Sequence, residues 1–105
     1  QYYYIKQKGQ VLRIPLQEIF YFKSDRKKVT AVTRTKEEAF YARLSDIEAE
    51  LPRGFIRIHN RYLVNLRHVD RIGNTFCLCG GEKLPVSRAC RQDLAVAFAR
   101  KILNI

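Results

Sequence analysis

The side chains best suited to chemistry in this chain are cations and one amide that lie along a single stretch of extended sequence. Residues 55–72 (FIRIHNRYLVNLRHVDRI) contain four arginines and one acid. Alternating apolar residues in this stretch predict a half-buried strand, and the polar break at His59-Asn60-Arg61 predicts a sharp bend. A strand that carries guanidinium groups on its wet face suits a polyanionic partner. The chemistry that this stretch predicts is therefore binding rather than catalysis.

Nothing else in the sequence supports an enzyme or a metal site. The two histidines are His59 and His68, and no pair of carboxylates stands in an apolar setting where a raised pKa would be expected. Cys77 and Cys79 are two residues apart, which is not the C-x-x-C spacing of a zinc site. We interpret these cysteines, and Cys90 further on, as small buried hydrophobes. Because glycine-rich phosphate loops are also absent, we expect no enzyme, no metal and no cofactor.

The composition describes one small basic domain. The 105 residues are 47% hydrophobic, enough for a modest core, and we expect residues 1–105 to form a single domain. The net charge of +10 exceeds what solubility requires and favours an acidic partner. The sequence has neither a long apolar run nor a signal peptide, and three cysteines suit a reducing compartment, so we expect a cytoplasmic protein without membrane contact. Because the chain starts at Gln1, we interpret it as part of a longer protein.

The charge is unevenly distributed along the chain. Residues 1–36 carry nine Lys or Arg and two acids, and residues 53–105 carry ten and three. Between them, residues 37–52 carry one Arg and five acids. We therefore expect the two basic regions to face an anionic partner and the acidic segment to face away from it.

Short strands joined by turns are predicted for most of the chain. The expected strands are 1–8, 11–14, 19–22, 29–33, 39–41, 55–58, 62–66, 69–72, 75–78 and 83–86. The clearest turn signals are Lys8-Gly9-Gln10, Gly73-Asn74 and Gly80-Gly81. A short turn or one helical turn is expected at 16–18, and 24–28 is expected to be a charged loop.

Two helices are predicted among these strands. Ser45-Asp46-Ile47-Glu48 matches a capping box with Ser45 as the N-cap, so a short acidic helix should run to about Leu51 before Pro52. Ser87 is expected to cap a last helix. The apolar stripe of that helix is Cys90, Leu94, Ala97, Phe98 and Ile102. The resulting fold class is mainly β and antiparallel, with one short internal helix and a C-terminal helix.

Three groups of polar residues are candidates for ligand contact. Arg88 directly follows the expected cap, where a cation opposes the helix dipole by ~0.3–1 kcal/mol, so a phosphate or base contact is favoured over a tolerated surface arginine. Asn60 is either a bend residue alone or an amide that can pair with an adenine edge, and the two interpretations are equally supported. Arg26-Lys27-Lys28 is either a simple polar turn or a ligand contact.

The order of these motifs resembles the LytTR DNA-binding domain family. The resemblance is carried by FIRIHNRYLVN at 55–65 and LPVSR at 84–88, and it extends to the strand at 19–22 and both expected helices. It implies an elongated fold of small antiparallel sheets and a role as the output domain of a bacterial transcription regulator, behind a receiver or sensory domain. Members of this family enter successive major grooves of duplex DNA with loops, bend the DNA, and commonly bind paired direct repeats as dimers.

The resemblance also implies roles for individual residues. Base contacts are expected from Asn60, Arg88, Lys27 and Lys28. Contacts with the DNA backbone are expected from the basic and polar residues around them, which are Arg26, Arg57, His59, Arg61, Ser87 and Arg91.

Two other functions remain open from the residues themselves. The chain could be a β-barrel RNA-binding module in which aromatic residues stack on exposed bases. The aromatic candidates are Tyr2, Tyr4, Tyr21 and Phe22. It could also be a basic protein-interaction domain that docks an acidic partner.

Overall fold

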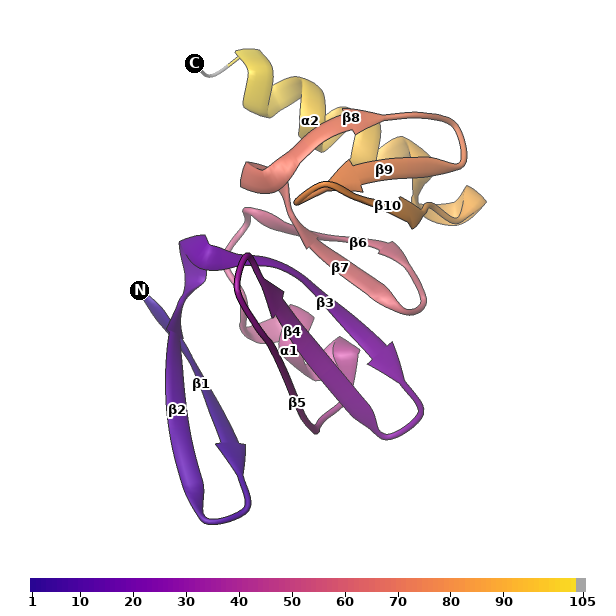
Figure 1. Ribbon diagram of the computed structural model, residues 1–105. Helices are drawn as coiled ribbons and strands as arrows, with labels where there is room; N and C mark the ends of the chain where they lie inside the picture. The colour runs from indigo at the N-terminus through magenta and orange to yellow at the C-terminus, as the bar shows by residue number, and fades with distance from the viewer. Residues whose placement is uncertain (104–105) are drawn as a thin grey trace.

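A computed structural model describes residues 1–103, which form ten strands, two α-helices and three single 3-10 turns (Figure 1). The strands are β1 (Tyr2–Gln7), β2 (Gln10–Pro15), β3 (Ile19–Asp25), β4 (Lys28–Thr33), β5 (Glu37–Tyr41), β6 (Phe55–His59), β7 (Tyr62–Asn65), β8 (Val69–Ile72), β9 (Phe76–Cys79) and β10 (Glu82–Pro85). The helices are α1 (Leu44–Glu50) and α2 (Arg91–Leu103), and the 3-10 turns are η1 (Leu16–Glu18), η2 (Leu66–His68) and η3 (Arg88–Cys90). The predicted fold class is confirmed.

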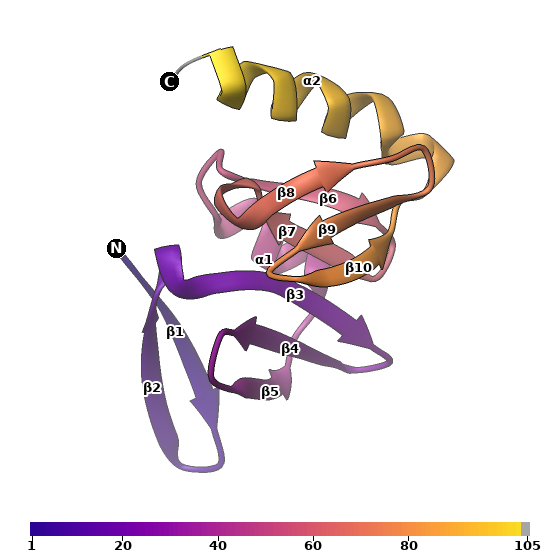
Figure 2. The same cartoon turned by 45° about the horizontal axis from the view of Figure 1, so that its top comes forward.

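The strands form three antiparallel sheets that follow one another along an elongated molecule. A five-stranded sheet in the order β5-β4-β3-β7-β6 lies in the centre, between the β1-β2 hairpin and the β10-β9-β8 sheet. Helix α2 covers β6 and the β8–β10 sheet at one end, as Figure 2 shows. The principal extents are 42 × 29 × 24 Å, so the molecule is elongated as expected.

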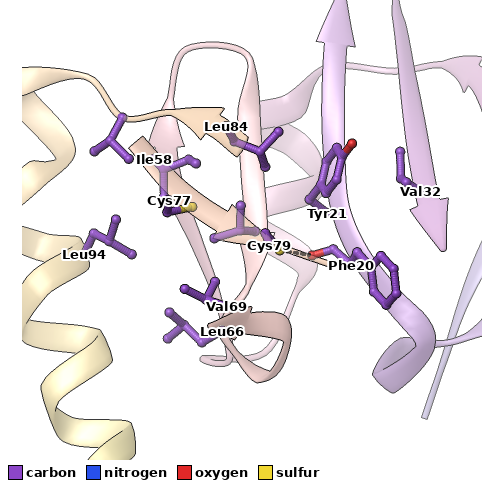
Figure 3. Close-up of a cluster of buried hydrophobic side chains, with 12 residues drawn as sticks. Phe20, Tyr21, Val32, Ile58, Leu66, Val69, Cys77, Cys79, Leu84 and Leu94 are labelled. Atoms are coloured by element: carbon purple, nitrogen blue, oxygen red, sulfur yellow. Dashed lines mark hydrogen bonds between the residues drawn. The ribbon is translucent and has the colours of Figure 1, made fainter. Parts of the chain in front are cut away.

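The central sheet is covered on both faces, which produces two hydrophobic cores. The helix-side core, under α2, consists of Phe20, Tyr21, Val32, Ile58, Val64, Leu66, Val69, Cys77, Cys79, Leu84, Val86 and Leu94 (Figure 3). The hairpin-side core, under the β1-β2 hairpin and α1, consists of Ile5, Ile14, Ile19, Phe22, Val29, Ala31, Phe40, Leu44, Ile47 and Leu63. Burial on two faces accounts for the uninterrupted apolar run at 19–22.

A register shift in β3 distributes that run between the two cores. The pairing with β4 slips between Ile19 and Tyr21. Adjacent residues Phe20 and Tyr21 therefore both enter the helix-side core, while Ile19 and Phe22 enter the hairpin-side core.

The predicted N-terminus of the short acidic helix is wrong by two residues, because the N-cap is Arg43 and not Ser45. Helix α1 begins at Leu44, its N-cap is Arg43, and no side chain caps it. The amides of Asp46 and Ile47 both donate to the Arg43 carbonyl, over 3.1 and 3.2 Å. Leu44 and Ile47 are both buried, so packing of these two side chains sets the start of the helix in place of the capping box at Ser45.

The last helix also starts differently from the prediction. Ser87 makes no side-chain cap, and η3 lies between it and α2, which begins at Arg91. The Ser87 amide is used elsewhere, because it donates to the Ile58 carbonyl over 2.8 Å. The predicted apolar stripe is present at Leu94, Ala97 and Phe98, which pack in or against the helix-side core.

The stripe prediction fails at its end, where Ile102 is 52% exposed. Helical spacing identifies the face of a helix, but it does not say how far the surface beneath that face extends.

The expected charged loop at 24–28 is instead the end of a β-hairpin. Strands β3 and β4 continue to Asp25 and from Lys28, so only Arg26 and Lys27 lie in the turn. Arg26 has a φ of 59°, the left-handed conformation that a tight two-residue hairpin turn requires. The two cations therefore project from a short, well-defined tip.

Candidate nucleic-acid interface

Three segments that are far apart in the sequence lie along one side of the molecule. They are the β3–β4 turn, the β6–β7 turn and η3, at the right of Figure 1, and together we call them the contact edge. The predicted site residues on this edge are Arg26, Lys27 and Lys28 from the first segment, His59, Asn60 and Arg61 from the second, and Ser87, Arg88 and Arg91 at or beside the third. Arg57 lies just before the second turn, in β6.

Hydrogen bonds hold the three segments in fixed positions. The Ser24 amide donates to the Arg61 carbonyl over 2.8 Å, and the Arg61 Nε donates to the Ser24 carbonyl over 3.1 Å. The Ser87 amide donates to Ile58 over 2.8 Å, which ties the approach to η3 onto β6. Because these bonds are mostly between main chains, the relative placement of the segments is set by the sheet itself.

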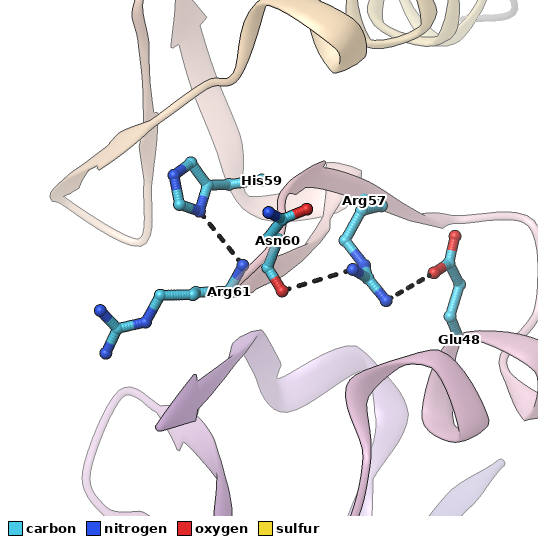
Figure 4. A network of polar contacts seen from close by, with 5 residues as sticks. All are labelled: Glu48, Arg57, His59, Asn60 and Arg61. Carbon is cyan, nitrogen blue, oxygen red and sulfur yellow. Dashed lines mark hydrogen bonds and ion pairs between the residues drawn. The ribbon is translucent and has the colours of Figure 1, made fainter. Parts of the chain in front are cut away.

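The β6–β7 turn is built without the Asn60 side chain. The Arg61 amide donates to His59 Nδ1 over 3.1 Å, and Arg57 donates from a terminal guanidinium nitrogen to the Asn60 carbonyl over 3.3 Å (Figure 4). Asn60 is exposed, its φ is not positive, and its side-chain amide has no hydrogen-bond partner within residues 1–103. Forming the bend therefore does not account for an asparagine at this position.

His59 has a donor left over after building the turn. Its Nδ1 accepts from the Arg61 amide, so the neutral ring carries its proton on Nε2. The ring packs against Tyr62 with centroids 5.9 Å apart, which fixes its orientation. An N–H group held in this way can donate to a phosphate oxygen.

Arg57 is directed inward rather than to solvent. One terminal nitrogen of its guanidinium lies 3.0 Å from Glu48 Oε1 in α1, and the other contacts the Asn60 carbonyl. The side chain is only 23% exposed. The acidic segment therefore pairs with a basic residue at Glu48, because β6 packs beside α1.

The cations of the first two turns differ in how they are held. The Arg61 guanidinium has one nitrogen 3.6 Å from Asp25 but remains largely exposed. Lys28 extends over the ring of Tyr41, with its ammonium 5.1 Å from the ring centroid. Arg26 and Lys27 are exposed at the tip of the hairpin.

A hollow of about 660 Å³ lies between the two turns and the start of α1. Its lining includes Arg26, Lys27, Arg57 and Asn60, and it adds Arg43, which the sequence analysis did not select. Arg43 is exposed, and no motif marks it, because its position beside the turns depends on where α1 packs.

A second hollow of about 430 Å³ surrounds the other predicted base-contacting residue, Arg88. It is lined by Arg88, Arg91, Asn74 and neighbouring residues of α2. The Nε of Arg91 is buried and has no hydrogen-bond partner within the described chain. Asn74 was interpreted only as a turn residue, but the β8–β9 loop brings it beside the two arginines.

Two of the aromatic residues considered for RNA stacking are not available for it. Tyr21 is 5% exposed and Phe22 is fully buried, whereas Tyr2 and Tyr4 are exposed on the β1-β2 hairpin. A stacking platform needs neighbouring exposed rings. The central sheet therefore offers no such platform at 21–22.

Two of the three cysteines, Cys77 and Cys79, pack in the helix-side core. Cys77 and Cys79 are fully buried, and burial raises the pKa of the first thiol to about 11 and of the second to about 12. The Cys79 thiol donates to the Phe20 carbonyl over 3.2 Å (Figure 3). No group of three or more His, Cys, Asp or Glu side chains able to hold a metal occurs among residues 1–103. Over the same range, neither α-helix has the length and hydropathy of a membrane span.

Comparisons with known proteins give a family match and a similar fold. The family model of the LytTr DNA-binding domain matches residues 9–99. Among solved structures, the chain is similar to the LytTr DNA-binding domain of a protein described as a methyl-accepting/DNA response regulator from Bacillus cereus. That similarity has a TM-score of 0.71 at 23% sequence identity and covers 99% of this chain and 97% of that one. No curated protein sequence matches the chain.

Proposed function

Because this chain belongs to the LytTr DNA-binding domain family, we propose that it binds duplex DNA sequence-specifically as the output domain of a bacterial transcription regulator. The observation that carries the proposal is the contact edge. Its three exposed polar segments are held together by the Ser24–Arg61 and Ser87–Ile58 hydrogen bonds. A fixed set of donors and acceptors is what readout of base edges requires.

The proposed division of labour follows from how each side chain is held. Asn60, whose amide is not used by the fold, pairs with the edge of an adenine, and Arg88 makes a forked contact with a guanine. Lys27 and Lys28 extend the base contacts from the β3–β4 turn. The phosphate contacts come from the remaining polar residues of the edge, which are Arg26, His59, Arg61, Ser87 and Arg91. These segments enter successive major grooves, and the DNA bends to meet them.

Arg57 is the residue whose proposed role changes most. Its guanidinium is engaged by Glu48 and by the Asn60 carbonyl, and little of it is exposed. We therefore propose that only its small exposed part contacts the DNA backbone. Its main role is to link Glu48 to the Asn60 carbonyl within the fold.

The proposal extends to partners of the full-length regulator. Two copies bind paired direct repeats, and an upstream receiver or sensory domain controls their binding in the cytoplasm. The net charge of +10 supports attraction to DNA of any sequence. The fixed polar side chains of the contact edge support discrimination between DNA sequences.

Selection of bound sequences from a pool of random duplexes tests the function. We expect enrichment of one motif, followed by specific binding at least ~10³-fold tighter than binding to a scrambled duplex of the same length. Recovery of no motif would contradict sequence-specific binding. Preferential competition by single-stranded RNA would favour the RNA-binding module, and indifference to both nucleic acids would favour a protein-interaction domain.

A further inference from the structure

We propose that Glu48, an acidic residue in α1, is a positioning residue for DNA recognition. It holds Arg57, and Arg57 holds the turn that carries Asn60. This inference rests on the proposed function for its consequence, but the arrangement itself is a property of the free protein. Under this proposal an acidic residue of α1 favours DNA binding, although its negative charge alone would oppose it.

The three residues form a continuous chain of polar contacts from the helix to the tip of the turn (Figure 4). Glu48 Oε1 lies 3.0 Å from one terminal nitrogen of Arg57, and the other terminal nitrogen donates to the Asn60 carbonyl over 3.3 Å. A guanidinium is planar and presents its donors in fixed directions. Orienting one of its nitrogens on the carboxylate therefore orients the other on the carbonyl.

Arg57 needs Glu48 because it is poorly solvated. Its side chain is 23% exposed, and its Nε is buried and has no hydrogen-bond partner in the described part of the chain. A charge withdrawn from water is destabilised unless an opposite charge compensates for it. Without the Glu48 carboxylate, the guanidinium would move toward solvent and leave the Asn60 carbonyl.

The turn needs Arg57 because few other contacts hold its tip. The pairing of β6 with β7 slips between Arg57 and His59, so the regular ladder is interrupted just before the turn. Beyond that point, side-chain contacts of the turn are the bond from the Arg61 amide to His59 Nδ1 and the contacts of the Arg61 guanidinium with Ser24 and Asp25. Among residues 1–103, the Arg57 bond is the side-chain contact that reaches Asn60 itself. Loss of the Arg57 contact would leave Asn60 in several orientations, and ordering it again on DNA would reduce affinity.

Simple electrostatics makes the opposite forecast. Glu48 is an acid beside a surface proposed to bind a polyanion, so neutralising it should strengthen binding to any DNA. The sign of the change therefore separates a positioning role from a purely electrostatic one. Glu50 provides the matched control, because it is an exposed acid in the same helix and makes no ion pair within residues 1–103.

The test compares Glu48→Gln with Glu50→Gln on the cognate duplex and on a scrambled one, by fluorescence anisotropy at one salt concentration. We expect Glu48→Gln to weaken cognate binding roughly 5-fold, the effect of about 1 kcal/mol, without weakening scrambled binding. Glu50→Gln should leave both unchanged or slightly tighter. If Glu48→Gln behaves like Glu50→Gln on both duplexes, the positioning role is excluded.

Two further measurements extend the test, and the second of them, on the free protein, does not depend on DNA. Arg57→Lys retains the charge but cannot contact both partners, so we expect it to lose cognate affinity, and Glu48→Gln added to it should have no further effect. In the free protein, Glu48→Gln should accelerate hydrogen exchange of the Arg61 amide, and Glu50→Gln should not. Wild-type protein that does not distinguish the duplexes would refute the proposed function. Unchanged exchange in Glu48→Gln would refute the inference alone.

Discussion

Two hydrogen bonds join the main chain of Ser24 to Arg61, and each of the two residues donates one of them. The Ser24 amide donates to the Arg61 carbonyl over 2.8 Å, and the Arg61 Nε returns a bond to the Ser24 carbonyl over 3.1 Å. These bonds join the ends of two hairpins that are 37 residues apart in the sequence. The β3–β4 and β6–β7 turns therefore move together, and the side chains on one turn are positioned relative to those on the other.

Replacing Arg61 removes only one of these two bonds. We expect Arg61→Ala to lower the free energy of unfolding by about 1 kcal/mol or less, because the bond is exposed and the main-chain bond remains. Its affinity for cognate and scrambled duplexes should fall by the same factor, since its guanidinium is a proposed phosphate contact. Urea denaturation and DNA titration measure the two effects. A loss confined to the cognate duplex would show that Arg61 reads a base.

Asn60→Ala and Arg88→Ala should reduce specificity. Each forked contact with a base contributes roughly 1–3 kcal/mol of discrimination, so both variants should lose cognate affinity far more than random affinity. Arg26→Ala, which removes an exposed proposed phosphate contact at the tip of the β3–β4 hairpin, is the comparison, and we expect it to weaken both duplexes about equally. Neither Asn60→Ala nor Arg88→Ala should change the melting temperature appreciably, because both residues are exposed. Equal losses on both duplexes would remove these two residues from the set of base readers.

Binding should depend steeply on salt. The contact edge carries six Lys or Arg side chains, which are Arg26, Lys27, Lys28, Arg61, Arg88 and Arg91. If they neutralise about six phosphates, log K should fall with log salt at a slope near −5. Titration of a scrambled duplex over a range of salt concentrations gives the slope. A slope near zero would contradict the electrostatic account.

Stability should decline in alkali because of the buried thiols. Burial raises the pKa of Cys77 from 9.0 to about 11 and that of Cys79 to about 12. Above pH 9 the unfolded chain releases protons that the folded chain retains, so the free energy of unfolding falls as pH rises, by at most about 1.4 kcal/mol per pH unit for each thiol. The half-buried Tyr3 and the buried Tyr21, whose pKa values burial raises to about 12, act in the same direction above pH 10.

Urea denaturation across this alkaline range checks the effect. The double variant Cys77→Ala, Cys79→Ala should show a shallower dependence on pH than the wild type, although it is less stable overall. Equal pH dependence in the two proteins would show that the thiols do not contribute.

The turn between β9 and β10 offers a matched pair of glycines. A Cβ on Gly80 would overlap the Phe20 ring, whereas a Cβ on Gly81 would meet nothing within 4 Å. Both residues have positive φ, so Gly81→Ala should cost only the backbone term of about 1–2 kcal/mol. Gly80→Ala should cost about 1–3 kcal/mol more, because the ring must shift within a packed core. Thermal unfolding of both variants measures the difference, and equal losses would contradict the clash.

Local patterns predicted most of the β structure, because the signals for hairpins are local. Gly9, Gly73 and Gly80 each lie in or beside a turn where the sequence predicts one, and the strands between the turns alternate or are uniformly apolar. The residues of the contact edge could be selected for a similar reason. They lie at the ends of those same hairpins, so predicting the hairpins also locates the candidates.

The features that could not be predicted depend on contacts between distant segments. Ser45 has the local pattern of a cap, but burial of Leu44 and Ile47 starts the helix earlier. The pairing of Glu48 with Arg57 depends on where α1 packs against β6, and the proximity of Asn74 to Arg88 depends on how the β8–β9 loop meets η3. No sequence-spacing rule predicts which residues meet where two distant segments pack together.

The construction of the β6–β7 turn has a consequence for how binding preferences can diverge. His59 and Arg57 hold the turn, and the side chain at position 60 contributes no hydrogen bond to it among residues 1–103. Position 60 can therefore change without a compensating change elsewhere in the fold. If Asn60 reads a base as proposed, a single substitution there would give a lineage a different operator. In the laboratory, a library randomised at position 60 should consist almost entirely of folded proteins, each available for selection against a new site.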